Sequence, residues 1–205
     1  LGILIVWFTF GHYKFSRFSL GKVIPAAKWK AMTICTIPIV GITMVFYSIM
    51  NLFHLDFLPK QMMEMSYLGF LPYNIIGSFI SVYIFFGAIQ EELIRCGKKR
   101  WVQLLTLSIM MLPACMMSVT PSGDINVDLT VLGFISLCYC SWIYSKTRST
   151  IILIVLYFVS NLVPFQFESK VLGILLLIAG TALTIGGFAA LSRKLPEMLV
   201  KDEDE

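Results

Sequence analysis

Residues 171–191 read VLGILLLIAGTALTIGGFAAL and contain no charged side chain. A membrane-spanning helix needs about 20 mainly apolar residues, because the hydrocarbon core of a bilayer is about 30 Å thick and a helix rises about 1.5 Å per residue. This stretch is therefore long enough to cross a bilayer. Its glycines, Gly173, Gly180, Gly186 and Gly187, are expected to let a second helix approach closely.

Five more uncharged stretches precede this one, and the last two only just reach the minimum of about 17 residues. They are residues 31–53, 67–89, 101–119, 129–145 and 149–165. Residues 1–10 are also apolar and are expected to be the end of a helix that begins upstream. Of the 205 residues, 58% are hydrophobic and only 14% are charged, whereas about a quarter of a soluble domain is charged. The predicted fold is therefore all-α, a polytopic transmembrane helix bundle with about seven visible spans, or eight with an upstream helix.

The charged residues predict the orientation of this bundle. They form short clusters between the apolar stretches, and all but two of the 16 lysines and arginines lie in every second cluster. The two exceptions are Lys60 and Lys170. The positive-inside rule assigns the basic face to the cytoplasm. We therefore expect an integral protein of a bacterial cytoplasmic membrane, surrounded by lipid bilayer, with its C-terminus in the cytoplasm.

The clusters also divide the chain into three regions. Residues 1–30 combine the end of a transmembrane helix with a basic segment, which is either an interfacial helix or an ordinary cytoplasmic loop. Residues 31–193 are expected to form the membrane helical core. Residues 194–205 are expected to form an acidic cytoplasmic tail, as a solvated end of the chain.

The main polar feature beside the spans is the run FGAIQEELIRCG at residues 86–97. Two adjacent carboxylates, Glu91 and Glu92, at the end of a membrane helix are costly unless they are paired or functional. Glu91 and Arg95 are four residues apart and are expected to pair on a helix, whereas Glu92 points about 100° away. The run is therefore either a polar site or the end of a helix at the cytoplasmic surface, where water reaches both acids.

The remaining motifs offer little chemistry. The five cysteines are interpreted as small hydrophobic residues, because their spacing matches no zinc site. The sequence has no phosphate-binding glycine loop and no cluster of metal-ligating residues, so neither a metal nor a cofactor is assigned. Nucleic-acid binding is disfavoured, because the basic residues are spread over several loops and no recognition module is present.

The run at residues 86–97 resembles the first motif of the CAAX protease and bacteriocin-processing family, also called the Abi family, in which Glu-Glu-x-x-x-Arg is followed by Gly. Residues 133–135, 142–150 (WIYSKTRST) and 157–162 (YFVSNL) are similar to a later stretch of that family. There a helix ends in Tyr-x-x-Thr, a short turn contains Ser, and the next helix carries His-x-x-x-Asn. The resemblance covers about the last two-thirds of the chain and implies a CAAX-protease-like membrane core over residues 31–193.

The resemblance implies a chemistry as well as a fold. In that family a glutamate acts as the general base for a water that attacks a peptide bond within the membrane, and histidines on two further helices bind or polarise the reacting groups. Carried over to this sequence, the glutamate pair falls on Glu91 and Glu92. The first histidine falls on Met116, and the second histidine with its asparagine falls on Tyr157 and Asn161.

This sequence departs from the family's pattern at both histidines. The motif arginine also falls on Cys96, with Arg95 one residue early, and the only histidines are His12 and His54, outside the matching stretches. Methionine offers no proton, and tyrosine, with a reference pKa of about 10, replaces imidazole poorly at neutral pH. Losing one catalytic donor typically slows a reaction about a hundredfold or more. The resemblance is therefore to a protease that has lost its catalytic histidines.

Three functions remain open. In the first, the chain is a catalytically degenerate family member that binds a membrane-protein partner or a hydrophobic peptide. In the second, it is an active intramembrane glutamate-type endopeptidase that processes CAAX or bacteriocin substrates or confers self-immunity, and in the third it is a structural or transport subunit of a membrane complex. The missing histidines favour the first function. A binding protein would use a mutually satisfied polar cluster of Glu91, Glu92, Arg95, Tyr157 and Asn161, and an active enzyme would use Glu91, Glu92, Tyr157 and Asn161 for catalysis.

Overall fold

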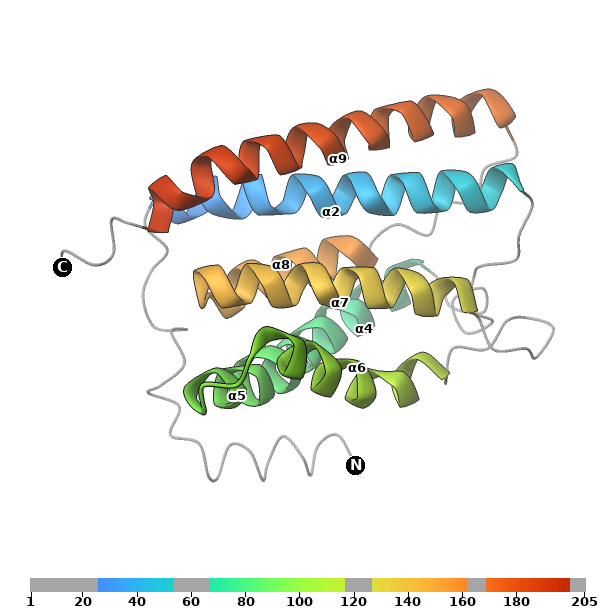
Figure 1. Ribbon diagram of the computed structural model, residues 1–205. Coiled ribbons are helices and arrows are strands. Elements are labelled where there is room, and N and C mark those ends of the chain that lie inside the picture. Colours follow the sequence, from blue (N-terminus) through green and yellow to red (C-terminus); the bar gives the residue numbers. More distant parts are fainter. Residues whose placement is uncertain (1–25, 54–66, 117–126, 162–168, 200–205) are drawn as a thin grey trace.

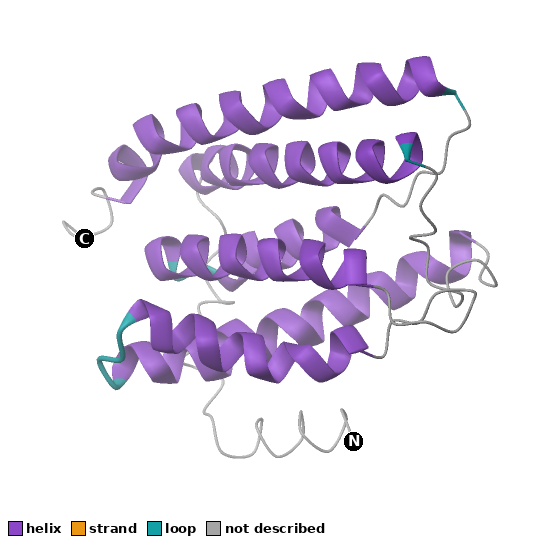
Figure 2. Ribbon diagram, turned by 45° about the vertical axis from the view of Figure 1, so that its right-hand side comes forward, coloured by secondary structure: helices purple, strands orange, loops and turns teal. Residues whose placement is uncertain are grey.

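The structure is a computed structural model that describes residues 26–53, 67–116, 127–161 and 169–199. The described residues are almost entirely helical and include no strand, which confirms the all-α fold class (Figure 2). The helices are α2 (Ala26–Leu52), α4 (Tyr67–Val82), η3 (Tyr83–Gln90), α5 (Glu91–Arg95), α6 (Arg100–Met116), α7 (Val127–Thr147), α8 (Thr150–Asn161) and α9 (Lys170–Leu199).

Each of the six uncharged stretches contains a helix over its described residues, and α4, η3 and α5 follow one another without a break. Three helical segments of the described chain are long and apolar enough to cross a membrane, namely Trp29–Leu52, Asn74–Arg95 and Lys170–Lys194. The predicted seven spans are not confirmed. Within the described part of the chain α6 has 17 residues and α8 has 12, whereas a crossing needs about 20, and α7 has 21 residues but carries Asp128 and Lys146. Residues 1–10 lie outside the described part of the chain.

The helices form three layers that lie side by side (Figures 1 and 2). The long helices α2 and α9 pair along their length on one side of the bundle, α7 and α8 lie in the middle, and the α4–α5 rod lies with α6 on the other side. Helices α7 and α8 both contact α2, and α8 also packs on α4. The middle layer therefore joins the two outer layers.

Successive helices run in opposite directions, and this brings the basic segments to one end of the bundle (Figure 1). The start of α2, the α5–α6 turn, the α7–α8 turn and the end of α9 all lie at that end. These segments carry Lys30, Lys98, Lys146 and Lys194 among other basic residues, whereas Lys170 starts α9 at the opposite end. The basic clusters that alternate along the sequence therefore gather at one end of the bundle. We call the end formed by these four segments the basic end.

The apolar core lies where the middle layer meets α2, η3 and α9. One hydrogen bond also crosses it, because the hydroxyl of Tyr139 in α7 donates to the carbonyl oxygen of Cys35 in α2 at 2.6 Å, in the turn before Pro38. The large side chains with almost no exposure are Ile39, Val82, Phe86, Leu107, Leu137, Ile143, Leu153, Leu156 and Leu191.

Glycines set the close approach of α2 and α9. A Cβ added at Gly41 would lie 2.6 Å from the backbone nitrogen of Thr184 and 2.7 Å from the carbonyl oxygen of Gly180. A Cβ at Gly180 or Gly187 would likewise come within 3.0 Å of atoms of α2. The prediction for Gly180 and Gly187 is therefore confirmed. It is wrong for Gly186, because among the described residues no atom lies within 4 Å of a Cβ added there.

Replacing Gly41 by alanine is expected to lower the free energy of unfolding in detergent by about 2 kcal/mol, because the added methyl group meets backbone atoms of α9 that cannot yield. Gly186→Ala is the matched control. It adds the same group to open space and is expected to be neutral or to gain up to about 1 kcal/mol of helix propensity. Thermal unfolding followed by circular dichroism measures both variants. Equal stability of the two variants would contradict the packing of α2 on α9.

Candidate functional site

The Glu91-Glu92 pair follows directly on a π-helix. In η3 (Tyr83–Gln90) the bonding is wider than in an α-helix, and the backbone N–H of Glu91 donates to the carbonyl oxygen of Phe86, five residues earlier. Tyr83, Phe86, Gly87 and Gln90 form the buried face of this segment. π-helical turns are rare and often accompany functional sites, since they turn the following residues away from their α-helical positions. Here η3 sets the directions in which Gln90 and Glu91 point.

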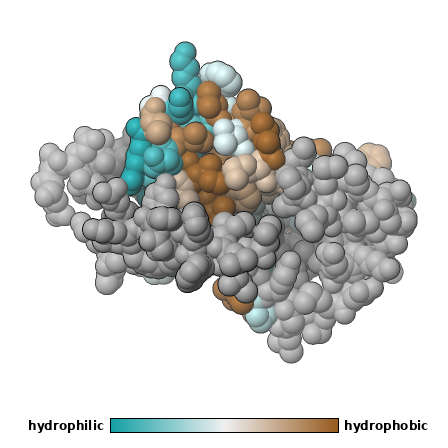
Figure 3. Space-filling view, turned by 90° about the horizontal axis from the view of Figure 1, so that it is seen from below, coloured by the Kyte–Doolittle hydropathy of each residue, from teal (hydrophilic) through white to brown (hydrophobic). Residues whose placement is uncertain are grey.

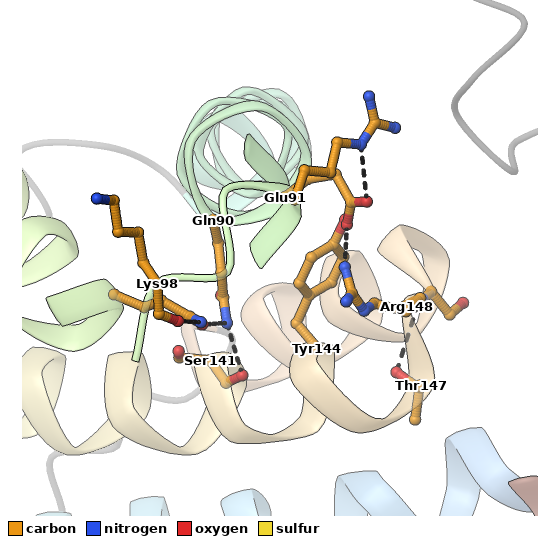
Figure 4. A network of polar contacts seen from close by, with 10 residues as sticks. Gln90, Glu91, Lys98, Ser141, Tyr144, Thr147 and Arg148 are labelled. Atoms are coloured by element: carbon orange, nitrogen blue, oxygen red, sulfur yellow. Dashed lines mark hydrogen bonds and ion pairs between the residues drawn. The ribbon is translucent and has the colours of Figure 1, made fainter. Parts of the chain in front are cut away.

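The carboxylate of Glu91 is bound by three side chains (Figure 4). Arg148 Nη1 donates to Glu91 Oε2 at 2.6 Å, and the Tyr144 hydroxyl donates to the same oxygen at 3.0 Å. Arg95 Nε donates to Glu91 Oε1 at 3.3 Å, so the predicted pairing across four residues is confirmed. Two guanidinium groups and a phenol therefore surround one carboxylate, and these contacts join α5 to the α7–α8 turn.

The backbone of Arg148 is strained in this position. Its φ of 49° lies in the left-handed region, which costs a residue other than glycine about 1–2 kcal/mol. The same backbone closes α7, because the N–H of Arg148 donates to the carbonyl oxygen of Tyr144 at 2.9 Å. Glycine is the usual residue at such a helix end. An arginine there is explained by its guanidinium, which reaches Glu91 from this turn.

A second polar contact lies one residue earlier, inside the bundle (Figure 4). The side chain of Gln90 is fully buried, and its Nε2 donates to the carbonyl oxygen of Ser141 at 3.0 Å and to Oε1 of Gln103 at 3.4 Å. Gln103 in turn donates to the carbonyl oxygen of Lys98 at 2.8 Å. These bonds tie η3 to α7 and to the α5–α6 turn. Within the described residues the Oε1 of Gln90 accepts no hydrogen bond, although it is buried.

Glu92 points elsewhere, as its position on the helix predicts. Its side chain is exposed, and its Oε1 lies 3.9 Å from the Sγ of Cys96, within range of a weak S–H donor. The two acids are thus in different surroundings. Glu91 is half-buried and neutralised, and Glu92 lies at the surface.

The other predicted site residues lie on α6 and α8. Tyr157 is buried, with its ring edge-on to Phe86 at 6.5 Å between centroids and its hydroxyl 4.0 Å from the Sδ of Met111. Asn161 ends α8 and Met116 ends α6, and their side chains lie outside the described part of the structure. His12 and His54 also lie outside the described residues. The structure therefore brings Glu91 and Arg95 together and packs the side chain of Tyr157 against Phe86 and Met111.

Tyr144 and Arg148 are the residues that the sequence did not assign to the site. Tyr144 belongs to the Tyr-x-x-Thr pattern and Arg148 was counted only as an orientation charge. The sequence does indicate that Tyr144 and Arg148 lie close to each other. They are four residues apart, at the end of one helix and in the turn that follows it. The distance to Glu91 could not be predicted, since 57 positions separate Glu91 from Arg148.

The surroundings of the Glu91 carboxylate differ from those of a general base. Among the described residues, no group of three or more His, Cys, Asp or Glu side chains converges. A general base needs a carboxylate oxygen that faces water and the proton it removes. Both oxygens of Glu91 instead accept hydrogen bonds from cationic or phenolic donors. These contacts join α5 to the end of α7 and the turn after it.

The chain matches no known protein family, no curated protein and no solved structure.

The Arg148 contact is expected to stabilise the fold despite its backbone conformation. Arg148→Ala should lower the free energy of unfolding by about 1 kcal/mol. This is less than a buried charge-assisted hydrogen bond contributes, because both partners are partly exposed to solvent. Arg148→Gly loses the same bond but relieves the left-handed backbone, so it should be about 1 kcal/mol more stable than Arg148→Ala. Thermal unfolding in detergent measures both variants.

A double-mutant cycle separates the ion pair from the backbone effect. In a Glu91→Gln background, Arg148→Ala should cost clearly less than in the wild-type chain. An unchanged cost in that background would mean that Arg148 acts without Glu91.

Proposed function

We propose that this protein is a catalytically degenerate, CAAX-protease-like integral membrane protein that binds a membrane-protein partner or a hydrophobic peptide. The observation that carries the proposal is that both oxygens of Glu91 accept bonds from cationic or phenolic side chains, namely Arg95, Tyr144 and Arg148. In the resembling family this position belongs to the pair that activates water. Here the carboxylate is committed to holding helices together.

The positions of the family's histidines support the same proposal. Tyr157 falls at the position of the second histidine, and its side chain is buried against Phe86 and Met111. A phenol in such surroundings is a poor proton shuttle at neutral pH. The outer faces of the bundle carry large, exposed apolar side chains, which can contact lipid or a partner helix. Among them are Ile75, Ile76, Phe79, Val131, Phe134 and Ile135.

The proposed topology has seven visible spans, with the basic end in the cytoplasm. Its support is the gathering of four basic segments at one end of the bundle (Figure 1), combined with the positive-inside rule. Short helices such as α8 then cross with the help of flanking residues or local thinning of the bilayer.

Cys96 offers a direct test of this topology. Its side chain is exposed at the basic end, whereas Cys35 and Cys140 are buried and Cys138 is half-buried. The side chain of Cys115 lies outside the described part of the structure, so it is first changed to serine. In this background a membrane-impermeant maleimide is expected to label the protein in inside-out membrane vesicles and not in intact cells. Cys96→Ser should remove most of the vesicle signal. Labelling of Cys96 in intact cells would place the basic end outside.

The binding function is tested by mild-detergent purification from native membranes, with mass spectrometry of the co-purifying proteins. We expect one stoichiometric membrane partner with the wild-type chain and the same partner with Glu92→Gln. The exposed Glu92 is the matched change, because its removal leaves the contacts of Glu91 in place. A peptide or precursor that accumulates only with Glu92→Gln or with the Glu91→Gln, Glu92→Gln double variant would show that the acids cut, and would overturn the proposal.

A further inference from the structure

Four consecutive exposed residues cross the α5–α6 turn and the start of α6. They are Lys98, Lys99, Arg100 and Trp101, and the side chain of Trp101 is 62% exposed. Within the described part of the chain, none of these three cations has an ion-pair partner. The nearest acids along the chain are Glu91, which two arginines already neutralise, and Glu92. Among the described residues, the turn therefore presents a compact group of three cations that form no ion pair.

The backbone fixes this turn, so the cations do not sit on a loose loop. Gly97 has a φ of 66°, a conformation that glycine adopts without strain, and it ends α5. The N–H of Lys98 donates to the carbonyl oxygen of Leu93, and that of Gly97 donates to the carbonyl oxygen of Ile94, both at 2.9 Å. These two bonds make a Schellman motif. The side chain of Gln103 adds a third tie to the carbonyl oxygen of Lys98.

An apolar strip on α6 begins at the same place. Trp101, Leu105 and Ile109 follow each other at four-residue spacing, and their side chains are 62%, 52% and 61% exposed. Residues four apart share a helix face, so the strip runs along α6 for about 12 Å from the basic turn. In the part of the lower face that is coloured in Figure 3, hydrophilic residues lie directly beside hydrophobic ones.

We propose that the α5–α6 turn and this strip bind an anionic phospholipid. Lys98, Lys99 and Arg100 contact the phosphate and the charged headgroup, Trp101 lies at the level of the headgroup boundary, and an acyl chain runs along Leu105 and Ile109. A half-bilayer of hydrocarbon is about 15 Å deep, which matches the length of the strip. A basic cluster next to an aromatic and an apolar face suits a lipid, because a lipid has both an anionic headgroup and an acyl chain. A soluble anion would contact the cations but not the apolar strip.

The lipid is tested by thermal unfolding of the purified full chain in mild detergent. Phosphatidylglycerol is expected to raise the midpoint, whereas phosphatidylcholine with the same acyl chains should raise it much less. Each lysine or arginine near an anionic surface contributes about fivefold to affinity. The triple variant Lys98→Gln, Lys99→Gln, Arg100→Gln should therefore need about a hundredfold more phosphatidylglycerol for half of the shift.

The matched control is Lys30→Gln, Arg193→Gln, Lys194→Gln, which removes the same charge at the basic end but from α2 and α9, on the other side of the bundle (Figure 1). It should change the half-saturating lipid concentration by about threefold or less. Equal losses in the two triple variants would mean a diffuse charge effect and would overturn the site. So would an equal shift with phosphatidylcholine, or an equal shift with inorganic phosphate at the same concentration.

Discussion

A carboxylate at the end of a helix of membrane length has to be hydrated or compensated, and Glu91 meets this constraint with partners from two other parts of the chain. Arg95 comes from the same helix, but Tyr144 and Arg148 come from the far end of α7 and the turn that follows it. The compensation of one charge thereby fixes how the α4–α5 rod meets the middle layer. Helix packing at the basic end depends on this contact.

The two sides of the bundle are held by different physical means. On one side, Gly41 and Gly180 bring α2 and α9 so close that backbone atoms touch, and dispersion between helices supplies the attraction. On the other side, Gln90 and Glu91 join helices by hydrogen bonds and charge. Membrane helices lack a hydrophobic force between them, since lipid is as apolar as leucine. Close packing and polar bonds are the two remaining sources of specificity; the first brings α2 and α9 together, and the second joins η3 and α5 to α7 and the turn after it.

Much of the fold follows from the sequence, because charge alone marks where helices stop. Each of the six uncharged stretches contains a helix over its described residues, and the Glu91–Arg95 pair follows from four-residue spacing. Helix length was less predictable, since absence of charge is not the same as a helix of about 20 residues. The π-helix before Glu91 and the long-range partner Arg148 could not be predicted, because both depend on which helices become neighbours. The same holds for Gly41, whose role is visible only beside Thr184.

Two turns at the basic end adopt the same left-handed backbone conformation, one with a glycine and one with an arginine. Gly97 follows α5 with a φ of 66°, which glycine adopts without strain. Arg148 follows α7 with a φ of 49°, which is strained for a residue with a side chain. Backbone strain of this kind persists only when the surroundings determine the position more strongly. At Arg148 the determining contact is the ion pair with Glu91, so the strained residue and the half-buried acid stabilise each other. A carboxylate that compensates strain in a neighbouring turn is unsuited to exchange protons with water, since each loss of its charge would also release that turn. Glu91 is therefore better explained as a fixed link between helices than as a base, and this is the physical ground of the proposal that the protein works by binding.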